Sequence, residues 1–357
     1  MTIYWIYIAT CLLSAMVVLV STPLVKSIAL RCGKFDLPDD RKVHKQPMVR
    51  LGGAAIFFAT VFSSLIAGWA AFTLAHLPES AFVTTLLILL GGAGFFLIGF
   101  ADDWLHLSAH NRLLMQLTIS TLLWFLGLRI EVCSLPGLSP VALAWLSLPV
   151  TVLWLSGVVN AINWIDGLDG LAAGISGITA ASLIVWCMAI AQPVPAILGA
   201  ALVGSLLGFL YYNYNPATIF MGDGGSYFLG FVLASLCIVG PQHVDSPFAT
   251  LLPLLILAVP VGDMLSVIAI RLYRKKSPFS ADRLHLHHRL LDRDFSHQKT
   301  VWILYVLTFL TSAIALVVAG LIDVLGLLLA ITAISAVLLG WLRKQSRTFE
   351  ILAITGK

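Results

Sequence analysis

Long apolar segments dominate this sequence and constrain its fold more than any other feature. Eleven of them are separated by short polar or Pro/Gly-marked stretches, with approximate bounds 3–28, 51–75, 81–101, 113–129, 138–159, 171–190, 194–211, 227–241, 247–270, 300–320 and 324–342. Charged residues make up 11% of the chain, against roughly 25% in soluble domains. Because isolated strands cannot satisfy their backbone in lipid, we expect an all-α integral membrane protein, a polytopic bundle of about 11 transmembrane helices.

The positions of lysine and arginine predict how the bundle is oriented. If successive connections alternate between the two sides, 20 of the 21 basic residues lie on one side, and Arg129 is the exception. The positive-inside rule then places the N-terminus outside and the C-terminus inside. Residues 1–342 form one predicted polytopic domain, and 343–357 form a basic cytoplasmic tail. The predicted cytoplasmic connections are 29–50, 102–112, 160–170, 212–226 and 271–299.

Composition also argues against several classes of protein. The net charge of +4 gives no support for nucleic-acid binding. The five cysteines are scattered, without the paired spacing of a zinc site or a disulfide framework. Of the 17 acidic residues, only Glu79, Glu131, Asp245 and Asp323 fall on the predicted outer side, so we expect the chemistry to take place on the cytoplasmic side.

The connection 102–112 begins with two adjacent carboxylates. Asp102 and Asp103 follow a helix that ends there, where its dipole disfavours negative charge. A divalent cation would relieve this repulsion, although a solvated loop is the more common reason for an isolated Asp pair. Arg112 stands at the start of the next helix, either to bind an anion such as phosphate or as a cytoplasmic anchor.

The connection 160–170 has an oxygen-bearing side chain at every third position: Asn160, Asn163, Asp166 and Asp169. On a regular α-helix the first and last would point in nearly opposite directions, whereas in a 3₁₀ or looped segment all four would converge. Such a group of hard oxygen donors suits Mg²⁺ or ribose hydroxyls. A set of helix caps is the alternative.

The connections 212–226 and 271–299 carry further candidates. In the first, Asn213, Asn215 and Phe220 precede glycines that flank Asp223 and would allow close approach to a phosphate. The second contains Arg283, His285, His287, His288 and Arg289, a donor surface suited to an acidic sugar nucleotide. Zinc is the competing ligand there. Asp263 lies within a predicted span, as a functional group or as the partner of a nearby arginine.

In order, these motifs resemble the polyprenyl-phosphate N-acetylhexosamine-1-phosphate transferases, from about residue 35 to residue 290. The matching motifs are Lys45 with Gly52-Gly53, Asp102-Asp103-Trp104, Asn160-x-x-Asn163-x-x-Asp166-Gly-Leu-Asp169-Gly, Asn215-Pro-Ala-x-x-Phe220-Met-Gly-Asp223 and Ser-Pro-Phe-Ser-x-Asp-Arg283-x-His285-x-His287-His288. The last motif is most similar to the branch that makes GlcNAc-diphospho-undecaprenol for O-antigen, enterobacterial common antigen and related glycans. The peptidoglycan branch carries three consecutive histidines in this motif, whereas in this chain Leu286 stands between His285 and His287. A third aspartate found in many relatives is replaced by His106.

The resemblance implies a reaction. Sugar-1-phosphate would pass from a UDP-N-acetylhexosamine to undecaprenyl phosphate with Mg²⁺ or Mn²⁺, releasing UMP at the cytoplasmic face of the bacterial inner membrane. Many relatives are homodimers. The implied metal ligands are Asp223 and Asn163, and the implied catalytic residues are Asp102, Asp103 and Asp166. The implied substrate-binding residues are Lys45, Arg112, Asp169, Asn213, Asn215, Phe220, Arg283, His285, His287, His288 and Arg289.

Other functions remain open at this point. The same reaction with another UDP-N-acetylsugar, such as a GalNAc, FucNAc or QuiNAc donor, would use the same motifs. A hydrolase that releases UMP without a lipid acceptor is a more distant alternative. A lipid or ion transporter would need ionisable groups near the membrane midplane in both halves, and here only Asp263 lies in a span.

Overall fold

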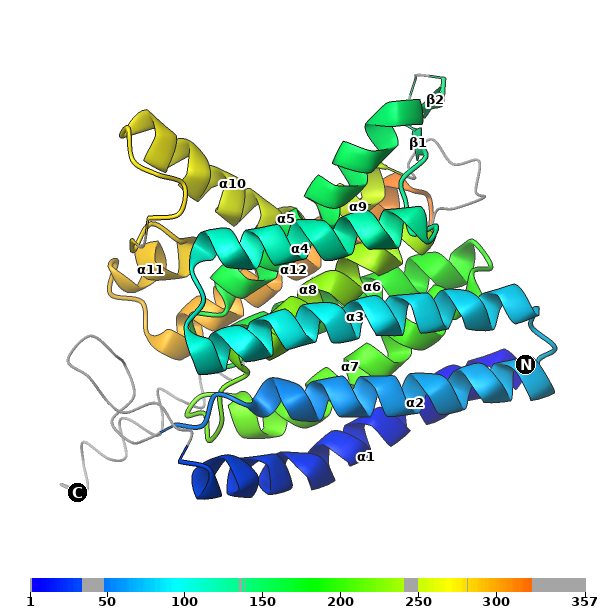
Figure 1. The fold of residues 1–357 in the computed structure, drawn as a ribbon, viewed down its shortest axis with the longest axis horizontal. Coiled ribbons are helices and arrows are strands. Elements are labelled where there is room, and N and C mark those ends of the chain that lie inside the picture. The colour runs from blue at the N-terminus through cyan, green and yellow to red at the C-terminus, as the bar shows by residue number, and fades with distance from the viewer. Residues whose placement is uncertain are drawn as a thin grey trace.

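The computed structural model describes residues 2–33, 48–134, 137, 139–240, 250–280 and 282–322, which form a mostly helical bundle (Figure 1). The helices are α1 (Thr2–Arg31), α2 (Gly52–Leu74), α3 (Glu79–Leu105), α4 (Ala109–Phe125), α5 (Ser147–Ile165), α6 (Leu171–Ala189), α7 (Pro193–Asn213), α8 (Gly222–Val239), α9 (Leu251–Ile256), α10 (Ala258–Tyr273), α11 (Leu286–Leu291) and α12 (His297–Val318). A 3₁₀ turn over Ala144–Leu146 precedes α5. Strands β1 (Val132–Cys133) and β2 (Val141–Ala142) pair antiparallel.

Eight helices of the described residues are long and apolar enough to cross a membrane, which confirms an all-α, multi-pass membrane protein. They are α1, α2, α3, α5 with its preceding turn, α6, α7, α8 and α12. Two other predicted spans are shorter: α4 has 17 residues, and 247–270 contains two helices, of 6 and 16 residues, that meet at Leu257. The span predicted over 324–342 and the tail lie outside the described residues.

The start of the span predicted over 138–159 is wrong. Val141 and Ala142 form β2, and the helix begins only after the 3₁₀ turn that ends at Leu146. Apolar residues are typical of both a short hairpin and a helical turn, so composition does not separate the two.

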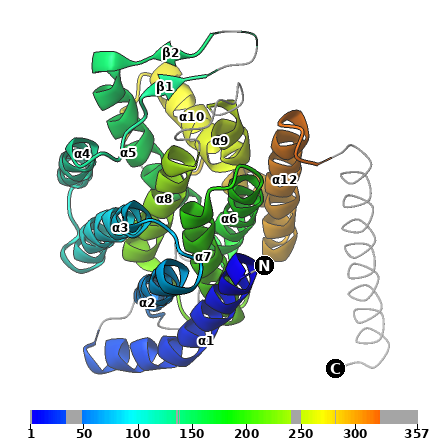
Figure 2. The ribbon, with the colours of Figure 1, turned by 90° about the vertical axis from the view of Figure 1, so that its right-hand side faces the viewer.

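Helix α8 lies in the middle of the bundle (Figure 2). Every residue from Gly224 to Val239 is buried, and the helix is apolar on all sides, as expected for a helix surrounded by others. Aromatic rings lock it to its neighbour α3, since the rings of Phe95 and Phe231 stack with centroids 4.8 Å apart. The first turn of α8 is therefore held rigidly by the helices around it.

The described parts of the connections predicted to be cytoplasmic gather at one end of the bundle, on the left in Figure 1. The last turns of α3 and α5 and the first turns of α4 and α8 meet there. Helix α10 extends obliquely from the bundle, and the chain then returns through α11 to the start of α12. One end of the molecule thus carries the residues that the sequence singles out.

Candidate active site

Two carboxylates end α3 and contact different neighbours. Asp102 is 5% exposed and forms an ion pair with Arg112 in the first turn of α4. Asp103 Oδ2 accepts a hydrogen bond of 3.1 Å from the backbone N–H of Gly224, at the start of α8. The positive end of the α8 dipole favours this carboxylate, which the dipole of its own helix disfavours.

Asp223 lies beside them in the first turn of α8. Its Oδ1 accepts a 2.8 Å hydrogen bond from Asn163 Nδ2, and its Oδ2 lies 3.9 Å from Arg112 Nη1. The carboxylate also lies within hydrogen-bonding reach of Asp102. Two carboxylates in such contact need a shared proton or a cation between them. The structure therefore brings Asp102, Asp103, Asp223 and Asn163 together, and Arg112 with them.

Asp102, Asp103, Asp223 and Arg112 border a cavity of about 560 Å³ at the end of the bundle, which is also lined by Arg50. Two arginines and three carboxylates on one cavity suit a ligand that carries both phosphate and a bound cation. Sequence reasoning missed Arg50 as a site residue, although its place two positions before Gly52 marked it. His106, in the position of the missing third aspartate, lines the same cavity.

The residues present fit a hard divalent cation that is completed by substrate. Among the described residues, no three His, Cys, Asp or Glu side chains already converge as a preformed metal cage. Mg²⁺ is usually held by one or two carboxylates together with waters and substrate phosphates. Asp223, Asp103 and the amide oxygen of Asn163 supply donors of that kind, so they would hold the ion beside the cavity.

Glycines bring the backbones of α2, α3 and α8 into contact around this cluster. A Cβ atom on Gly99 would lie 2.2 Å from the carbonyl oxygen of Asp223, and one on Gly53 would lie 2.3 Å from Gly225 Cα. Gly222 has a φ of +75°, which disfavours a side chain, and its Cβ would meet Arg50 O at 2.1 Å. In this structure the glycine-rich segment places Asp223 by close packing of protein against protein.

The convergence predicted for 160–170 is wrong in its geometry. Helix α5 continues through Asn160 and Asn163 to Ile165, so no looped segment gathers the four side chains. Asn160 donates to Gln116 Oε1 at 2.6 Å and faces α4, whereas Asn163 faces Asp223. Tertiary packing overrides the local preference, so α5 continues for more than a turn into the segment predicted to be a loop.

Asp166 comes directly after α5 and carries a perturbed carboxyl. Burial raises its pKa to about 7, the neighbouring Arg50 lowers it, and the carboxylates of Asp103 and Asp169 raise it further. A carboxyl poised near neutrality beside other charged groups is the kind of group found in catalytic sites. Its predicted catalytic role stays a prediction.

Four of the predicted substrate-binding residues, Asp169, Asn213, Asn215 and Phe220, lie in a separate cluster that is held by its own hydrogen bonds. Asp169 Oδ2 accepts from Asn215 Nδ2 at 2.9 Å and from Ala217 N at 3.1 Å. The Asn213 side chain accepts from Gly170 N and donates to Ile219 O. The backbone of Phe220 pairs with Val49 and Gly52. The structure thus joins 212–220 to the start of α6, and ligand contacts there stay a prediction.

The histidines of the last motif stack beside the end of α5. The rings of His285 and His287 are nearly parallel, with centroids 5.7 Å apart. The ring centroids of His287 and His288 are 4.3 Å apart. The His287 ring packs so closely against Gly167 that a Cβ there would lie 2.3 Å from Nε2. Gly167 follows Asp166, so the motif borders the acidic cluster, which consists of Asp102, Asp103, Asp166 and Asp223.

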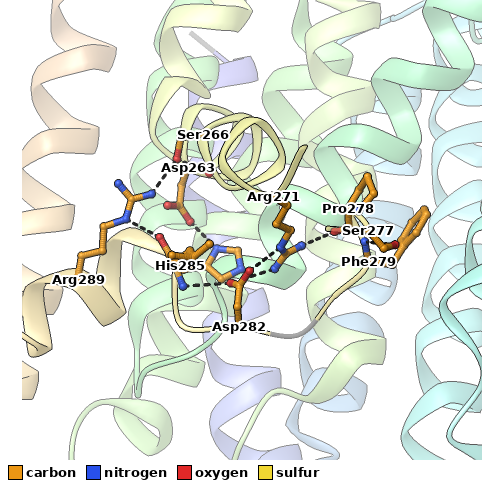
Figure 3. Close-up of polar contacts among 10 residues, drawn as sticks. Asp263, Ser266, Arg271, Ser277, Pro278, Phe279, Asp282, His285 and Arg289 are labelled. Atoms are coloured by element: carbon orange, nitrogen blue, oxygen red, sulfur yellow. Dashed lines mark hydrogen bonds and ion pairs between the residues drawn. The ribbon is translucent and has the colours of Figure 1, made fainter. Parts of the chain in front are cut away.

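The two arginines of this motif do not join the histidines in the same way. Arg283 is 70% exposed in its side chain and lies 3.6 Å from Asp292 at the surface. Arg289 donates to the carbonyl oxygen of Leu284 and to Ser266 Oγ (Figure 3). Lys45 lies outside the described residues, so its predicted phosphate contact stays a prediction.

His287 makes the folded protein sensitive to acid. Burial lowers its pKa to about 3, helped by the neighbouring His288 and His285, against about 6.5 in an unfolded chain. Between pH 7 and 5 this histidine therefore becomes protonated in the unfolded state but stays neutral in the folded state. Its contribution to the free energy of unfolding is fully present above pH 6.5 and is lost as the pH falls below that value. From pH 7 to pH 5 we expect the free energy of unfolding of the wild type to fall by about 2 kcal/mol more than that of His287→Asn.

Thermal unfolding in detergent at pH 7 and pH 5 measures this difference. His76→Asn, at an exposed histidine, is the matched control and should keep the wild-type pH dependence. Equal pH dependence in His287→Asn and the wild type would contradict the assignment.

Arg271 ties the connection after α10 to the bundle. It is 4% exposed, donates to both oxygens of Asp282 at 2.7 and 3.2 Å and also donates to Pro278 O (Figure 3). Its guanidinium group also lies over the ring of Trp164. Lysine lacks the planar fork for these contacts. Because a hydrogen bond to a charged group contributes about 1.5–3 kcal/mol, we expect tryptic cleavage within 274–284 to be at least about tenfold faster in Arg271→Lys. Arg293→Lys, at an exposed arginine, should leave the rate unchanged, and an unchanged rate in Arg271→Lys would refute this role.

Comparisons with known proteins agree with this site. The model of the glycosyl transferase family 4 matches residues 85–241. The chain is 37% identical over 308 residues to a Bacillus subtilis protein named "Probable undecaprenyl-phosphate N-acetylglucosaminyl 1-phosphate transferase", covering 86% of this chain and 83% of the relative. It is 33% identical over 318 residues to the "Decaprenyl-phosphate N-acetylglucosaminephosphotransferase" of Mycolicibacterium smegmatis, covering 82% of this chain and 77% of that one.

A more distant similarity links the chain to the peptidoglycan branch. It is 32% identical over 307 residues to a "Phospho-N-acetylmuramoyl-pentapeptide-transferase" of Halalkalibacterium halodurans, covering 80% of this chain and 89% of the relative. The matched region 85–241 holds the acidic cluster, and the longer matches cover four fifths of the chain or more. The motifs therefore identified the family correctly, and the chain belongs to the polyprenyl-phosphate N-acetylhexosamine-1-phosphate transferases of glycosyl transferase family 4.

Proposed function

We propose that the protein transfers N-acetylglucosamine-1-phosphate from UDP-N-acetylglucosamine to undecaprenyl phosphate, and so begins a lipid-linked bacterial glycan. A phosphate oxygen of the lipid attacks the phosphorus that bears the sugar, the bond from that phosphorus to the bridging oxygen breaks, and UMP leaves with the bridging oxygen. The names of the relatives support the donor sugar and the carrier.

The observation that carries the proposal is the meeting of Asp102, Asp103 and Asp223 with Arg112 on one cavity. Phosphoryl transfer depends mainly on positioning and on neutralising charge, and these side chains supply both. Mg²⁺, or Mn²⁺ in its place, would neutralise negative charge on the pyrophosphate when bound by Asp223 and Asn163.

The lipid phosphate needs little help to become a nucleophile. The second pKa of a phosphate monoester is near 6, so the group is mostly dianionic at pH 7. Asp102 and Asp103 would therefore position the acceptor, and Arg112 would hold one of the phosphates by its guanidinium group. Arg50, on the same cavity, supplies a second cation for this purpose.

The surroundings of the cavity suit an acceptor that stays in the membrane. Trp104 and Leu107 line the cavity, and Leu105 on the last turn of α3 is 69% exposed. A polyprenyl chain could lie against this apolar surface while its phosphate reaches the arginines. We place the reaction at the cytoplasmic face of the bacterial inner membrane, as the lysine and arginine distribution predicts. The homodimer expected from the resemblance stays a prediction.

Radiolabelled transfer by the purified protein tests the function. A panel of UDP-N-acetylsugars is offered with undecaprenyl phosphate, with Mg²⁺, with Mn²⁺ or with EDTA, and label in the lipid phase is counted. We expect UDP-N-acetylglucosamine to give lipid-bound label, and EDTA to abolish it until Mg²⁺ is restored. Lipid label from another sugar would change the donor, and label that stays water-soluble with UMP released would favour a hydrolase. No turnover with any donor would refute the proposal.

A further inference from the structure

Asp263 is a buried carboxylate of α10 that no step of the proposed reaction uses. Its side chain is 2% exposed, and both of its oxygens accept hydrogen bonds from the segment that leads into α11. A buried carboxylate is strongly destabilising unless it is paired, so these contacts are what keeps it there. The arginine partner considered from the sequence is not its partner, because Arg271 pairs with Asp282.

The two oxygens of Asp263 contact adjacent residues. Oδ2 lies 2.8 Å from His285 Nδ1 (Figure 3). Oδ1 accepts a 2.8 Å hydrogen bond from the backbone N–H of Leu286. One carboxylate thus sets the position of the backbone and the rotation of the ring at the same point.

The contact also selects which ring nitrogen carries hydrogen. An ionised carboxylate only accepts hydrogen bonds, so Nδ1 of His285 must be the donor. Nε2 is then the nitrogen left for a ligand, as a lone pair in the neutral ring or as a second N–H in the cation.

Other contacts keep the His285 ring from turning away. Trp164, at the end of α5, meets it edge-on at 5.5 Å, and His287 stacks on it with an angle of 9° between the rings. His287 in turn lies against Gly167, next to Asp166. The position of the His285 ring is therefore connected through packed side chains to the edge of the acidic cluster.

We propose that Asp263 is a positioning residue of the transfer reaction, which holds His285 with Nδ1 protonated and Nε2 directed to the sugar nucleotide. Asp263 acts through His285 and does not contact substrate itself. This role rests on the proposed function and on the predicted binding of the UDP-sugar by His285.

The variant Asp263→Asn tests the role with little change in shape. The amide oxygen can still accept from Leu286, but the amide N–H₂ facing His285 would donate to Nδ1 and favour the opposite tautomer. We expect kcat/KM for the UDP-sugar to fall about 10- to 100-fold, the range typical of residues that orient a functional histidine. The matched control Asp294→Asn, at an exposed carboxylate beyond α11, should stay within about twofold of the wild type.

A double-mutant cycle separates positioning from a purely structural effect. If Asp263 acts through His285, then adding Asp263→Asn to His285→Ala should change the residual single-turnover rate by less than about twofold. An equal fall in both backgrounds, or wild-type kinetics in Asp263→Asn, would overturn the proposal. If Asp263→Asn does not fold, Asp263→Glu takes its place in the same cycle. Absence of transfer by the wild type would instead refute the proposed function.

Discussion

Replacing Asp223 by asparagine is expected to lower sugar-phosphate transfer by a factor on the order of 10³ while leaving the bundle folded. The asparagine oxygen can still accept the hydrogen bond from Asn163, so the packing of α8 against α5 is kept. The negative charge that faces Arg112 and would bind the cation is lost. Charge and shape are thus separated at this position.

The measurement is initial-rate transfer of label to lipid, together with the Tm of the purified variant in detergent. Asp294→Asn removes a carboxylate of the same kind at an exposed site and should retain full activity. Activity of Asp223→Asn within about twofold of the wild type would remove Asp223 from the reaction. Restored transfer at high Mn²⁺ would further support a role in binding the metal.

The second large effect is expected from Gly99→Ala. The added methyl group would lie 2.2 Å from Asp223 O and 2.4 Å from Asp223 C, so the backbone of α8 must move away from α3. Overpacking of a rigid core destabilises a protein by about 1–3 kcal/mol. Because the clash here is with backbone, we expect the free energy of unfolding to fall by about 3 kcal/mol. Because the displaced residue is Asp223, transfer should also be lost.

Gly157→Ala is the matched control for this substitution. Gly157 lies within α5, and a Cβ there would meet nothing within 4 Å. Alanine in a helix interior is favoured over glycine by about 0.5–1 kcal/mol, so this variant should be as stable as the wild type or more so. A Gly99→Ala protein with wild-type Tm and activity would show that α3 and α8 are less tightly coupled than their packing indicates.

Much of the fold was predictable because lipid leaves few choices. An apolar run of about 20 residues must be helical to satisfy its backbone, and eight of the predicted spans are confirmed. The prediction was less good where the runs are short or broken. Helix α4 has only 17 residues, and the span over 247–270 breaks at Leu257, where one helix ends and another begins.

The sequence predicted which residues belong to the site better than it predicted how their side chains are arranged. Asp102, Asp103, Arg112 and Asp223 do meet on one cavity, as their positions at the helix ends suggested, and Asn163 donates a hydrogen bond to Asp223. The spacing of three between the oxygen-bearing side chains of 160–170 indicated a common ligand. These side chains instead contact different partners: Asn160 contacts Gln116 on α4, Asn163 contacts Asp223 on α8, and Asp169 contacts Asn215 after α7.

The order of amino acids carries the apolar periodicity, the charge asymmetry and the motifs, and these suffice for the class of fold, the family and the end of the bundle that holds the site. They do not carry distances between residues far apart in the chain. Asp263 pairs with His285, 22 residues later, and Asn163 with Asp223, 60 residues later, because α10 and α8 pack where they do. Local preferences depend on neighbours in sequence, whereas the partner of a buried charge depends on which helices become neighbours in space.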